Sequence, residues 1–150
     1  MILVIGGAGY IGSHTNKEMS RRGIPTVIYD LVYGHRESVK WGIFEEGDVA
    51  DGNRLDEIFD KYPIESVVHF AAYAYVGESV NKPSKYYNNN VCNTIKLLDK
   101  MRNHGVHNIV FSSTCATYGK PKQMPITEDM PQNPINPYGA SKLMVEHIME

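Results

Sequence analysis

Short apolar segments alternate along the chain with longer stretches in which apolar residues recur every three or four positions. The short segments contain few interspersed polar residues, which is typical of strands in a parallel sheet that is covered on both faces. We expect such strands at residues 2–5, 26–29, 44–47, 66–70 and 108–112. Helices are expected at residues 11–22, 53–61, 83–103 and 138–150.

This order of elements predicts an α/β protein with a Rossmann-type, doubly wound parallel sheet and helices on both faces. One domain is expected, because no internal repeat or linker interrupts the alternation. Prolines between residues 121 and 137 predict an extended loop before the last helix. The longest helix carries apolar residues along one face at helical spacing, and these are Val91, Ile95, Leu98 and Met101.

A glycine-rich turn follows the first strand and opens the first helix, with the sequence Gly-Gly-Ala-Gly-Tyr-Ile-Gly over residues 6–12. In such a turn Gly6 permits the sharp bend, Gly9 lets the backbone approach a pyrophosphate, and Gly12 allows close helix packing. The N-terminus of the helix offers unpaired N–H groups and the positive end of the helix dipole. Because a strand precedes it and a helix follows, the pattern predicts a dinucleotide site rather than a purely structural turn.

Two acids lie near the ends of the second and third strands. Asp30 has the position of a carboxylate that accepts hydrogen bonds from the adenosine ribose and repels a 2′-phosphate, which favours NAD over NADP. Arg36 is close enough in sequence to leave NADP open. Asp48 follows the third strand, where an acid that contacts the adenine edge and an acid that forms a turn are equally plausible.

Tyr138 and Lys142 are four positions apart, which places a phenol and an ammonium group on one face of the predicted last helix. A phenol has a pKa of about 10, so it acts as a base at neutral pH only where a nearby positive charge stabilises the phenolate. By itself this pair is equally consistent with a surface aromatic beside a solvated lysine. Thr114 follows the fifth strand and favours the catalytic interpretation, because its hydroxyl can bind the same substrate oxygen as Tyr138.

Composition restricts the classes of function. Fifteen basic and 17 acidic residues give a formal charge of −2, so no nucleic-acid partner is expected. No apolar run approaches the roughly 20 residues of a membrane span, so no membrane association is expected. Cys92 and Cys115 are too few for a disulfide framework, which indicates a reducing, cytoplasmic location. The six histidines lack metal-ligand spacing, so no metal is expected, and His104 and His107 are interpreted as solvated loop residues.

Several segments together resemble the N-terminal half of the extended short-chain dehydrogenases/reductases, and among these the UDP-glucose 4-epimerases. They are spread over nearly the whole chain: GGAGYIGSH at residues 6–14, GD at 47–48, HFAA at 69–72, VGES at 76–79, YY at 86–87, NNV at 89–91, FSSTCATYG at 111–119 and NPYGASK at 136–142. The resemblance implies a bound NAD that takes a hydride from C4 of a UDP-sugar and returns it to the other face of a 4-keto intermediate. It implies that Thr114 and Tyr138 surround the sugar 4-hydroxyl and that Lys142 holds the nicotinamide ribose.

The resemblance also implies a larger set of NAD-binding residues. These are Gly6, Gly9, Tyr10, Ile11, Gly12, Asp30, Asp48, Val49, Phe70, Ala71, Ala72, Asn89, Ser112, Tyr138 and Lys142. Asn89 is expected near the nicotinamide, within a run of three asparagines at residues 88–90 that is interpreted as a helix start. The sequence departs from the family where Leu31 follows Asp30 directly instead of Asp-Asn-Leu, and where Ala74 replaces a frequent lysine.

Members of this family are considerably longer, and their C-terminal half supplies most contacts with the uridine nucleotide. The resemblance therefore implies that residues 1–150 are the NAD-binding Rossmann domain of a truncated chain that lacks the substrate domain. It further implies a homodimer formed by the helices that match residues 86–103 and 138–150.

Three alternatives remain. Residues 74–79, 113–117 and 134–137 resemble UDP-arabinose 4-epimerases, so a UDP-pentose (UDP-xylose/UDP-arabinose) substrate is as compatible as UDP-glucose and UDP-galactose. A sugar-nucleotide 4,6-dehydratase is disfavoured, because relatives of that activity carry acids where this chain has Cys115 and Ala116. A catalytically silent NAD-binding fragment is the third alternative.

Overall fold

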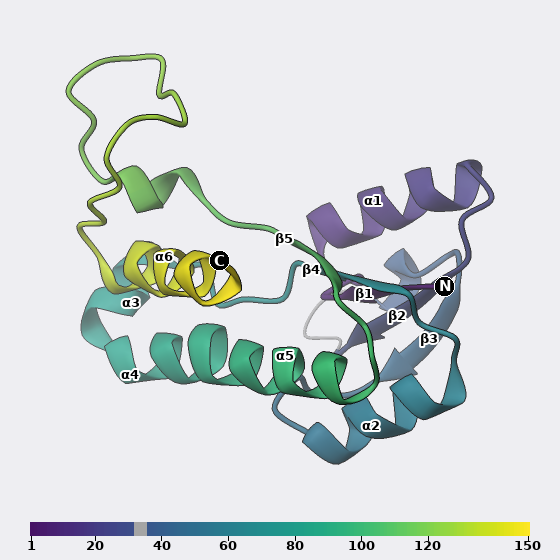
Figure 1. Ribbon diagram of the computed structural model, residues 1–150. Coiled ribbons are helices and arrows are strands. Elements are labelled where there is room, and N and C mark those ends of the chain that lie inside the picture. The colour runs from purple at the N-terminus through teal and green to yellow at the C-terminus, as the bar shows by residue number, and fades with distance from the viewer. Residues whose placement is uncertain (32–35) are drawn as a thin grey trace. The chain divides into compact units, whose positions relative to one another are not determined.

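The computed structural model describes residues 1–31 and 36–150 of the chain (Figure 1). Five parallel strands form one sheet in the order β3-β2-β1-β4-β5, so strand order reverses between β1 and β4. The strands are β1 (Ile2–Ile5), β2 (Thr26–Asp30), β3 (Ile43–Glu46), β4 (Ser66–His69) and β5 (Asn108–Phe111). The doubly wound parallel sheet predicted from the sequence is thereby confirmed.

The predicted helices are present, and no observed helix end lies more than one residue from the predicted end, apart from the interruption of the longest helix described below. The longer ones are α1 (Tyr10–Arg21), α2 (Gly52–Lys61), α5 (Asn93–Asn103) and α6 (Pro137–Met149). Shorter helical segments that the sequence did not predict are η1 (Arg36–Ser38), α3 (Val76–Asn81) and η3 (Cys115–Tyr118). The structure has no helix between η3 and α6, in agreement with the predicted extended loop.

Contacts within the chain divide it into two compact units. The first, called here the sheet unit, comprises residues 1–71 and 96–112 and contains all five strands. The second, called here the helical unit, comprises residues 72–95 and 113–150 and contains α3, η3 and α6. Each unit is described by itself below.

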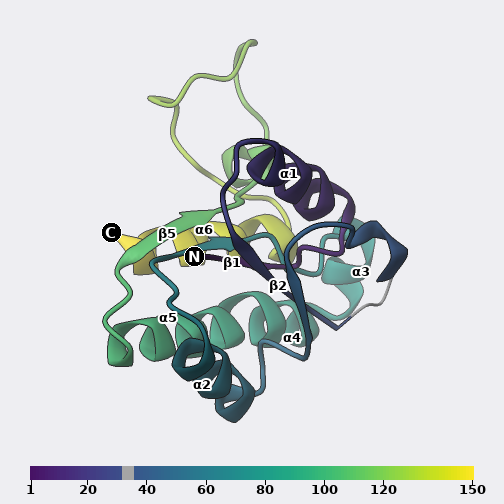
Figure 2. The same ribbon diagram turned by 90° about the vertical axis from the view of Figure 1, so that its right-hand side faces the viewer.

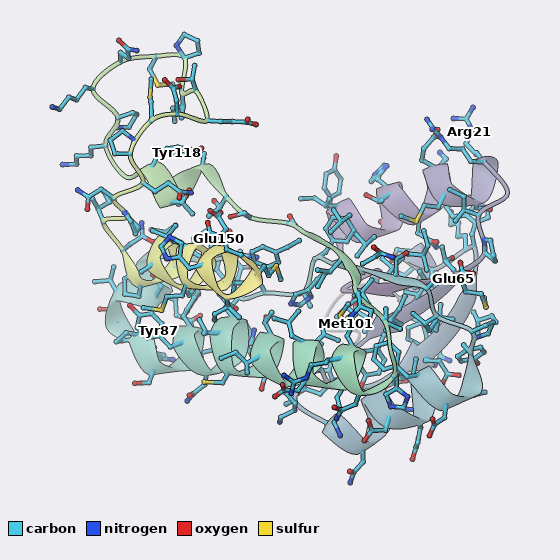
Figure 3. The ribbon with its side chains drawn as sticks, viewed as in Figure 1. Arg21, Glu65, Tyr87, Met101, Tyr118 and Glu150 are labelled. Atoms are coloured by element: carbon cyan, nitrogen blue, oxygen red, sulfur yellow. The ribbon has the colours of Figure 1, made fainter. Side chains whose placement is uncertain are left out.

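The core of the sheet unit lies between the sheet and two helices. Alternate strand residues such as Leu3, Val27 and Val67 are fully buried, and they pack with Leu55 of α2 and Leu97 of α5. Met101 of α5, which is labelled in Figure 3, belongs to the same core cluster. α1 covers the opposite face of the sheet, as the two views of the ribbon show (Figures 1 and 2). Helices therefore cover both faces, as predicted.

The predicted helix over residues 83–103 is interrupted by a π-helical segment. It consists of α4 (Pro83–Tyr86), the π-helical η2 (Tyr87–Cys92) and α5. The buried side chains along it are Tyr86, Asn90, Thr94, Leu97 and Met101, whereas Ile95 is 41% exposed. Of the predicted apolar stripe, Met101 is buried and Leu98 packs partly buried against the core, so only part of the stripe faces the core. A π-helical segment changes the number of residues per turn, so a stripe counted at ordinary helical spacing goes out of phase.

The helical unit is organised around α6, which packs against α3, α4, η2 and η3. The asparagine run at residues 88–90 lies inside η2 rather than at a helix start, so that interpretation is corrected. Pro83 occupies the start of α4 instead, where its missing N–H group carries no cost. The helix α6 begins at Pro137 with Asn136 as its cap, since the Asn136 side chain accepts a hydrogen bond of 2.8 Å from the Gly139 backbone N–H.

Candidate active site

The glycine turn of the sheet unit requires glycine at two of the predicted positions. Gly6 has a φ of +80°, and a Cβ atom there would lie 2.6 Å from the backbone nitrogen of Ala71. A Cβ atom on Gly12 would lie 2.3 Å from the carbonyl oxygen of Gly6. A larger residue at either position forces the backbone to move. The turn thus lies tightly between β1, the start of α1 and the segment after β4.

The first turn of α1 suits an anion. Gly9 is the N-cap residue and has no side chain to accept hydrogen bonds, and the first turn contains no acidic residue. Tyr10 and Ile11 are 83% and 57% exposed. A cavity of about 400 Å³ lies beside this turn and is lined by Ala8, Tyr10, Ser13, Glu37, Ser38 and Lys40. Backbone N–H groups of an uncapped helix start are the donors that the pyrophosphate of NAD needs, so the residues fit this cofactor.

Asp30 and Asp48 have well-defined places near the turn. The Asp30 carboxylate accepts a hydrogen bond of 2.9 Å from the backbone N–H of Ala8, inside the glycine turn. Asp48 accepts one of 2.9 Å from the N–H of Ala50 through its side chain. Its carbonyl oxygen accepts one of 2.7 Å from the hydroxyl of Tyr29. Asp48 therefore forms a turn before α2, which was one of its two predicted roles. Residues 32–35 lie outside the described residues.

The remaining predicted cofactor residues of the sheet unit follow strands. The backbone N–H groups of Phe70 and Ala71 both donate to the carbonyl oxygen of Ile5, at 2.8 and 3.2 Å. The backbone N–H of Ser112 donates to the carbonyl oxygen of His69 at 3.0 Å. Val49, like Ala71, packs partly buried against the core. These bonds fix the segments after β4 and β5 at the carboxyl edge of the sheet, where doubly wound sheets bind their ligands.

The three predicted catalytic residues all belong to the helical unit. Thr114 caps η3, since its hydroxyl oxygen accepts a hydrogen bond of 3.2 Å from the Ala116 N–H. A Cβ atom on Gly139 would lie 2.6 Å from the carbonyl oxygen of Ala116, so the first turn of α6 touches η3 backbone to backbone. Tyr138 lies in that first turn, half-buried, and Lys142 lies one turn further along. Close packing of η3 on α6 thus brings together the segments that carry Thr114 and Tyr138.

Lys142 is the most unusual ionisable group of this unit. Its side chain is only 3% exposed, and burial lowers its pKa to about 8, while the negative charge of Glu146 acts in the opposite direction. A buried ammonium with a lowered pKa is a common property of catalytic lysines. Such a group next to a phenol favours the phenolate form that a base requires.

Asn90 organises the helical unit and was not identified from the sequence. Its side-chain amide pairs with both backbone groups of Tyr73, at 2.9 and 3.0 Å, and donates to the hydroxyl of Ser141 at 3.1 Å. Ser141 in turn donates to the carbonyl oxygen of Tyr138 at 2.7 Å. The predicted cofactor residue Asn89 donates to the Asn90 side chain at 3.0 Å, and Ala72 precedes Tyr73. The sequence NNN contains no signal that distinguishes Asn90 from its neighbours.

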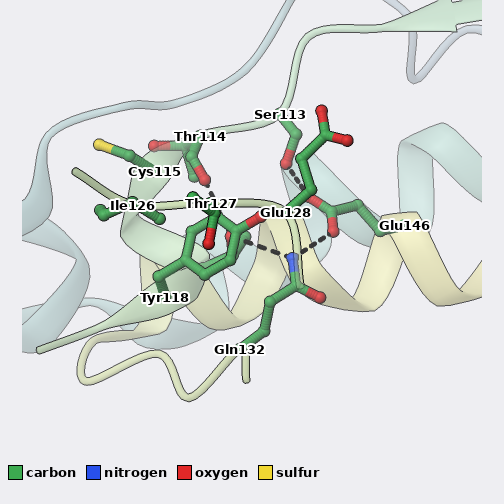
Figure 4. A pocket seen from close by; sticks show the side chains of 10 residues that line it. Ser113, Thr114, Cys115, Tyr118, Ile126, Thr127, Glu128, Gln132 and Glu146 are labelled. Carbon is green, nitrogen blue, oxygen red and sulfur yellow. Dashed lines mark hydrogen bonds between the residues drawn. The ribbon is translucent and has the colours of Figure 1, made fainter. Parts of the chain in front are cut away.

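A cavity of about 410 Å³ lies within the helical unit, and of the predicted catalytic residues Thr114 lines it (Figure 4). It is lined by Ser113, Thr114, Cys115, Thr117, Tyr118, Ile126, Thr127, Glu128, Gln132 and Glu146. Cys92 and Cys115 are both exposed free thiols. In residues 1–31 and 36–150, no helix is long and apolar enough to cross a bilayer, and no three His, Cys, Asp or Glu residues are grouped as metal ligands.

The interpretation of His104 as a solvated loop residue is wrong. Its ring stacks on Phe59 with centroids 5.3 Å apart, and its Nε2 atom lies 3.1 Å from the Asp56 carboxylate. Stacking and an ion-pair partner on α2 hold this histidine at the end of α5. His107 is exposed, as expected, and His35 lies outside the described residues.

Comparison with known proteins identifies the family. Residues 2–150 match the model of the NAD dependent epimerase/dehydratase family. The chain belongs to this family. It is 49% identical to the UDP-glucose 4-epimerase of Rhizobium meliloti (strain 1021), over 99% of this chain and 46% of that protein. It is 46% identical to the putative UDP-arabinose 4-epimerase 2 of Arabidopsis thaliana, over 99% of this chain and 38% of that protein.

A solved member of the epimerase/dehydratase family has the same fold. The crystal structure of UDP-glucose 4-epimerase from Brucella ovis in complex with NAD superposes with a TM-score of 0.95 and 54% identity. The match covers 98% of this chain and 46% of that one. The chain thus spans less than half the length of these relatives.

Proposed function

We propose that this chain is the N-terminal, NAD-binding half of a UDP-sugar 4-epimerase that interconverts UDP-glucose and UDP-galactose. The observation that carries the proposal is the close packing of η3 on the first turn of α6, because Thr114 caps η3 and α6 carries Tyr138 and the buried Lys142. These are a hydroxyl, a phenol and an ammonium, the set that a hydride-transfer reaction at a carbinol carbon requires. The identity to UDP-glucose 4-epimerases supports the substrate class.

In the proposed mechanism, NAD held by the glycine turn would supply the acceptor and later the donor of the hydride at sugar C4. Tyr138, as phenolate, takes the proton of the 4-hydroxyl while Thr114 hydrogen-bonds the same oxygen, and a ketone remains at C4. After the ring presents its other face, Tyr138 returns the proton to the oxygen. Lys142 stabilises the phenolate through its positive charge and binds the nicotinamide ribose.

The proposed cofactor residues follow the same division. The glycine turn, with Gly6, Gly9, Tyr10, Ile11 and Gly12, binds the pyrophosphate, and Asp30 binds the adenosine ribose. Asp48 and Val49 bind the adenine side. The backbone at Phe70, Ala71 and Ala72 lies close to the phosphates. The nicotinamide end is surrounded by Asn89, Ser112, Tyr138 and Lys142. Support comes from the uncapped start of α1, which matches an anionic ligand.

The decisive experiment uses the whole protein and UDP-galactose that carries deuterium at C4. An epimerase yields UDP-glucose with the deuterium retained at C4, because the hydride returns from the same bound cofactor. A dehydratase instead gives a product lighter by one water, and a silent binding protein gives no product although denaturation releases NAD. UDP-arabinose and UDP-xylose are assayed in parallel. A larger kcat/KM for these pentose substrates would mean that the protein is a UDP-pentose 4-epimerase. The similarity to the Arabidopsis protein supports this alternative.

We also propose that the protein is a homodimer. Exposed apolar side chains of Ile95 on α5 and of Met144 and Ile148 on α6 support it, at 41%, 45% and 42% exposure. Exposed apolar side chains of this kind are typical of a protein–protein interface. Light scattering of the whole protein, with and without Ile148→Glu, tests this: the variant is expected to be monomeric.

A cytoplasmic location and a role in galactose metabolism complete the proposal. The two free cysteines support the location, because exposed thiols persist in reducing compartments. The role follows from the proposed substrates. Cell fractionation, and growth on galactose of cells that lack the gene, test the two statements.

A further inference from the structure

The stripe of α6 that carries Tyr138 and Lys142 has a third polar member. Glu146 follows Lys142 by four residues, so the phenol, the ammonium and a carboxylate succeed one another on one helix face. The proposed function uses the first two groups and assigns no role to the third. Glu146 is half-buried, in contrast to Glu150 at the end of the same helix, which is exposed.

The Glu146 carboxylate receives hydrogen bonds from two segments outside α6. The hydroxyl of Ser113, the residue before Thr114, donates to one oxygen. The side-chain amide of Gln132 donates to the other oxygen at 2.7 Å. Figure 4 shows Ser113 and Gln132 converging on Glu146 at the wall of the cavity.

A second route leads from Gln132 back to Thr114. The Gln132 amide also donates to the hydroxyl of Thr117 at 3.1 Å, and that hydroxyl donates to the carbonyl oxygen of Thr114 at 3.0 Å. Thr117 is 1% exposed, so this bond is shielded from water. The carboxylate is therefore linked to the side chain of the residue before Thr114 and, through Gln132 and Thr117, to the carbonyl oxygen of Thr114.

We propose that Glu146 is a positioning residue that fixes the segment carrying Thr114 against α6 and supplies a negative charge that keeps Lys142 in its ammonium form. The inference rests on the proposed function and adds to it the group that maintains its electrostatics. Burial alone favours the neutral amine of Lys142, and a carboxylate one helical turn away opposes that tendency.

Other titratable groups lie on the elements that pack against α6 and at the cavity wall. They are Glu78 on α3, Lys85 and Tyr86 on α4, Tyr87 and Cys92 on η2, Cys115 and Tyr118 on η3, and Glu128 at the cavity wall. Glu78 is neutralised by Lys85, with Nζ–O distances of 2.9 and 3.1 Å, and it accepts a bond of 3.0 Å from the Tyr86 hydroxyl. Glu146 differs from Glu78 in that its partners Ser113 and Gln132 are neutral, so its charge remains available to Lys142.

The test replaces Glu146 by glutamine in the whole protein, which keeps the size of the side chain and removes its charge. The Lys142 titration is followed directly by NMR of ¹³C-labelled lysine ε-carbons, and kcat/KM is measured from pH 6 to 10. We expect the Lys142 titration to move down by about one pH unit, which leaves activity equal at pH 6 and about five-fold lower at pH 8. Glu150→Gln, on the same helix, is the matched control and is expected to leave both curves unchanged.

Ser113→Ala separates the two parts of the role. It removes one hydrogen bond to Glu146 and keeps the charge, so we expect kcat to fall several-fold with KM and the Lys142 titration unchanged. If Glu146→Gln does not fold, Ser113→Ala combined with Gln132→Leu tests the positioning part with the same readouts.

An unchanged Lys142 titration in Glu146→Gln overturns the charge role, and an unchanged kcat in Ser113→Ala overturns the positioning role. Failure of the proposed function looks different: the wild-type protein then has no epimerase activity, while the NMR titration of Lys142 in the two proteins still decides the inference.

Discussion

The two units of the chain arrange their predicted functional residues in different ways. In the sheet unit, the glycine turn offers backbone N–H groups to the proposed cofactor, and its residues are nearly contiguous in sequence. In the helical unit, the proposed catalytic groups are the side chains of Thr114, Tyr138 and Lys142, which come from segments joined by hydrogen bonds of Asn90, Gln132 and Glu146. We conclude that a cofactor turn can be built by local chain geometry, whereas a set of catalytic side chains needs contacts between distant segments.

The largest expected effect comes from a substitution in the helical unit that removes catalysis and leaves NAD binding by the sheet unit intact. Tyr138→Phe removes the proposed base, and general-base catalysis contributes roughly 10²–10⁴-fold, so we expect kcat to fall at least ~100-fold. NAD content, measured by mass spectrometry after denaturation, is expected to stay at the wild-type level. Tyr62→Phe, which removes a phenol of the sheet unit that is bonded to Glu45, is the control and should retain activity. Near-normal kcat in Tyr138→Phe would contradict the assignment.

The second-largest effect is expected from a substitution in the sheet unit that weakens NAD binding. Gly12→Ala places a methyl group 2.3 Å from the Gly6 carbonyl oxygen, and forced overpacking costs about 1–3 kcal/mol, so we expect NAD affinity to fall ~10- to 100-fold. Isothermal titration of cofactor-free protein with NAD measures the loss. The matched control is Gly77→Ala in α3, where a Cβ atom meets nothing within 4 Å. If Gly12→Ala binds NAD as the wild type does, the close approach is not required for the cofactor.

A third prediction concerns the loss of folding stability caused by the burial of the Lys142 ammonium group. The folded pKa of Lys142, about 8, lies below its ordinary value of 10.5, so the unfolded chain binds more protons between these values and stability rises with pH there. Lys142→Met should raise the free energy of unfolding by about 3 kcal/mol at pH 7 in cofactor-free protein, while it abolishes activity.

Urea denaturation at several pH values checks this result. The advantage of Lys142→Met is expected to shrink as pH rises from 8 to 10.5. Lys85→Met, which removes an exposed lysine paired with Glu78, should give no gain. A constant difference across that pH range would mean that the desolvation of Lys142 is not the cause.

The smallest effect is confined to the sheet unit. Lys100 and His104 donate to Asp56 and hold the pKa of its carboxyl below the ordinary value, so this stabilisation is present above about pH 4 and lost as pH falls through the folded pKa. Asp56→Asn should lower Tm by no more than a few degrees at pH 7, with activity unchanged. Thermal unfolding with Asp99→Asn as the control measures it, and a difference that persists at pH 3 would contradict the ion-pair explanation.

The sequence predicted the sheet unit in detail because its elements follow hydrophobic periodicity. Strands such as β1 and β4 are buried on both faces, and a continuous apolar run has no other simple interpretation in this alternation. Thr114, Tyr138 and Lys142 could be singled out because their chemistry is unusual at the positions where strands end and a helix begins.

The features that the sequence did not predict depend on contacts between distant residues, and such contacts leave no periodic pattern in the sequence. The π-helical η2 moves the buried stripe to Asn90 and Thr94, and the reason is visible only once Asn90 is seen to bind the backbone of Tyr73. The contact of Gly139 with Ala116 and the stacking of His104 on Phe59 likewise join residues far apart in sequence. Local preference cannot specify such partners.

The order in which the chain visits its two units has a practical consequence for protein engineering. The chain passes through the sheet unit, the helical unit, the sheet unit again and the helical unit again. No single cut yields either unit as one continuous polypeptide, so neither can be cloned by simple truncation. Isolating the glycine turn from the catalytic helix requires a redesigned connection between residues 71 and 96, or two co-expressed fragments that assemble.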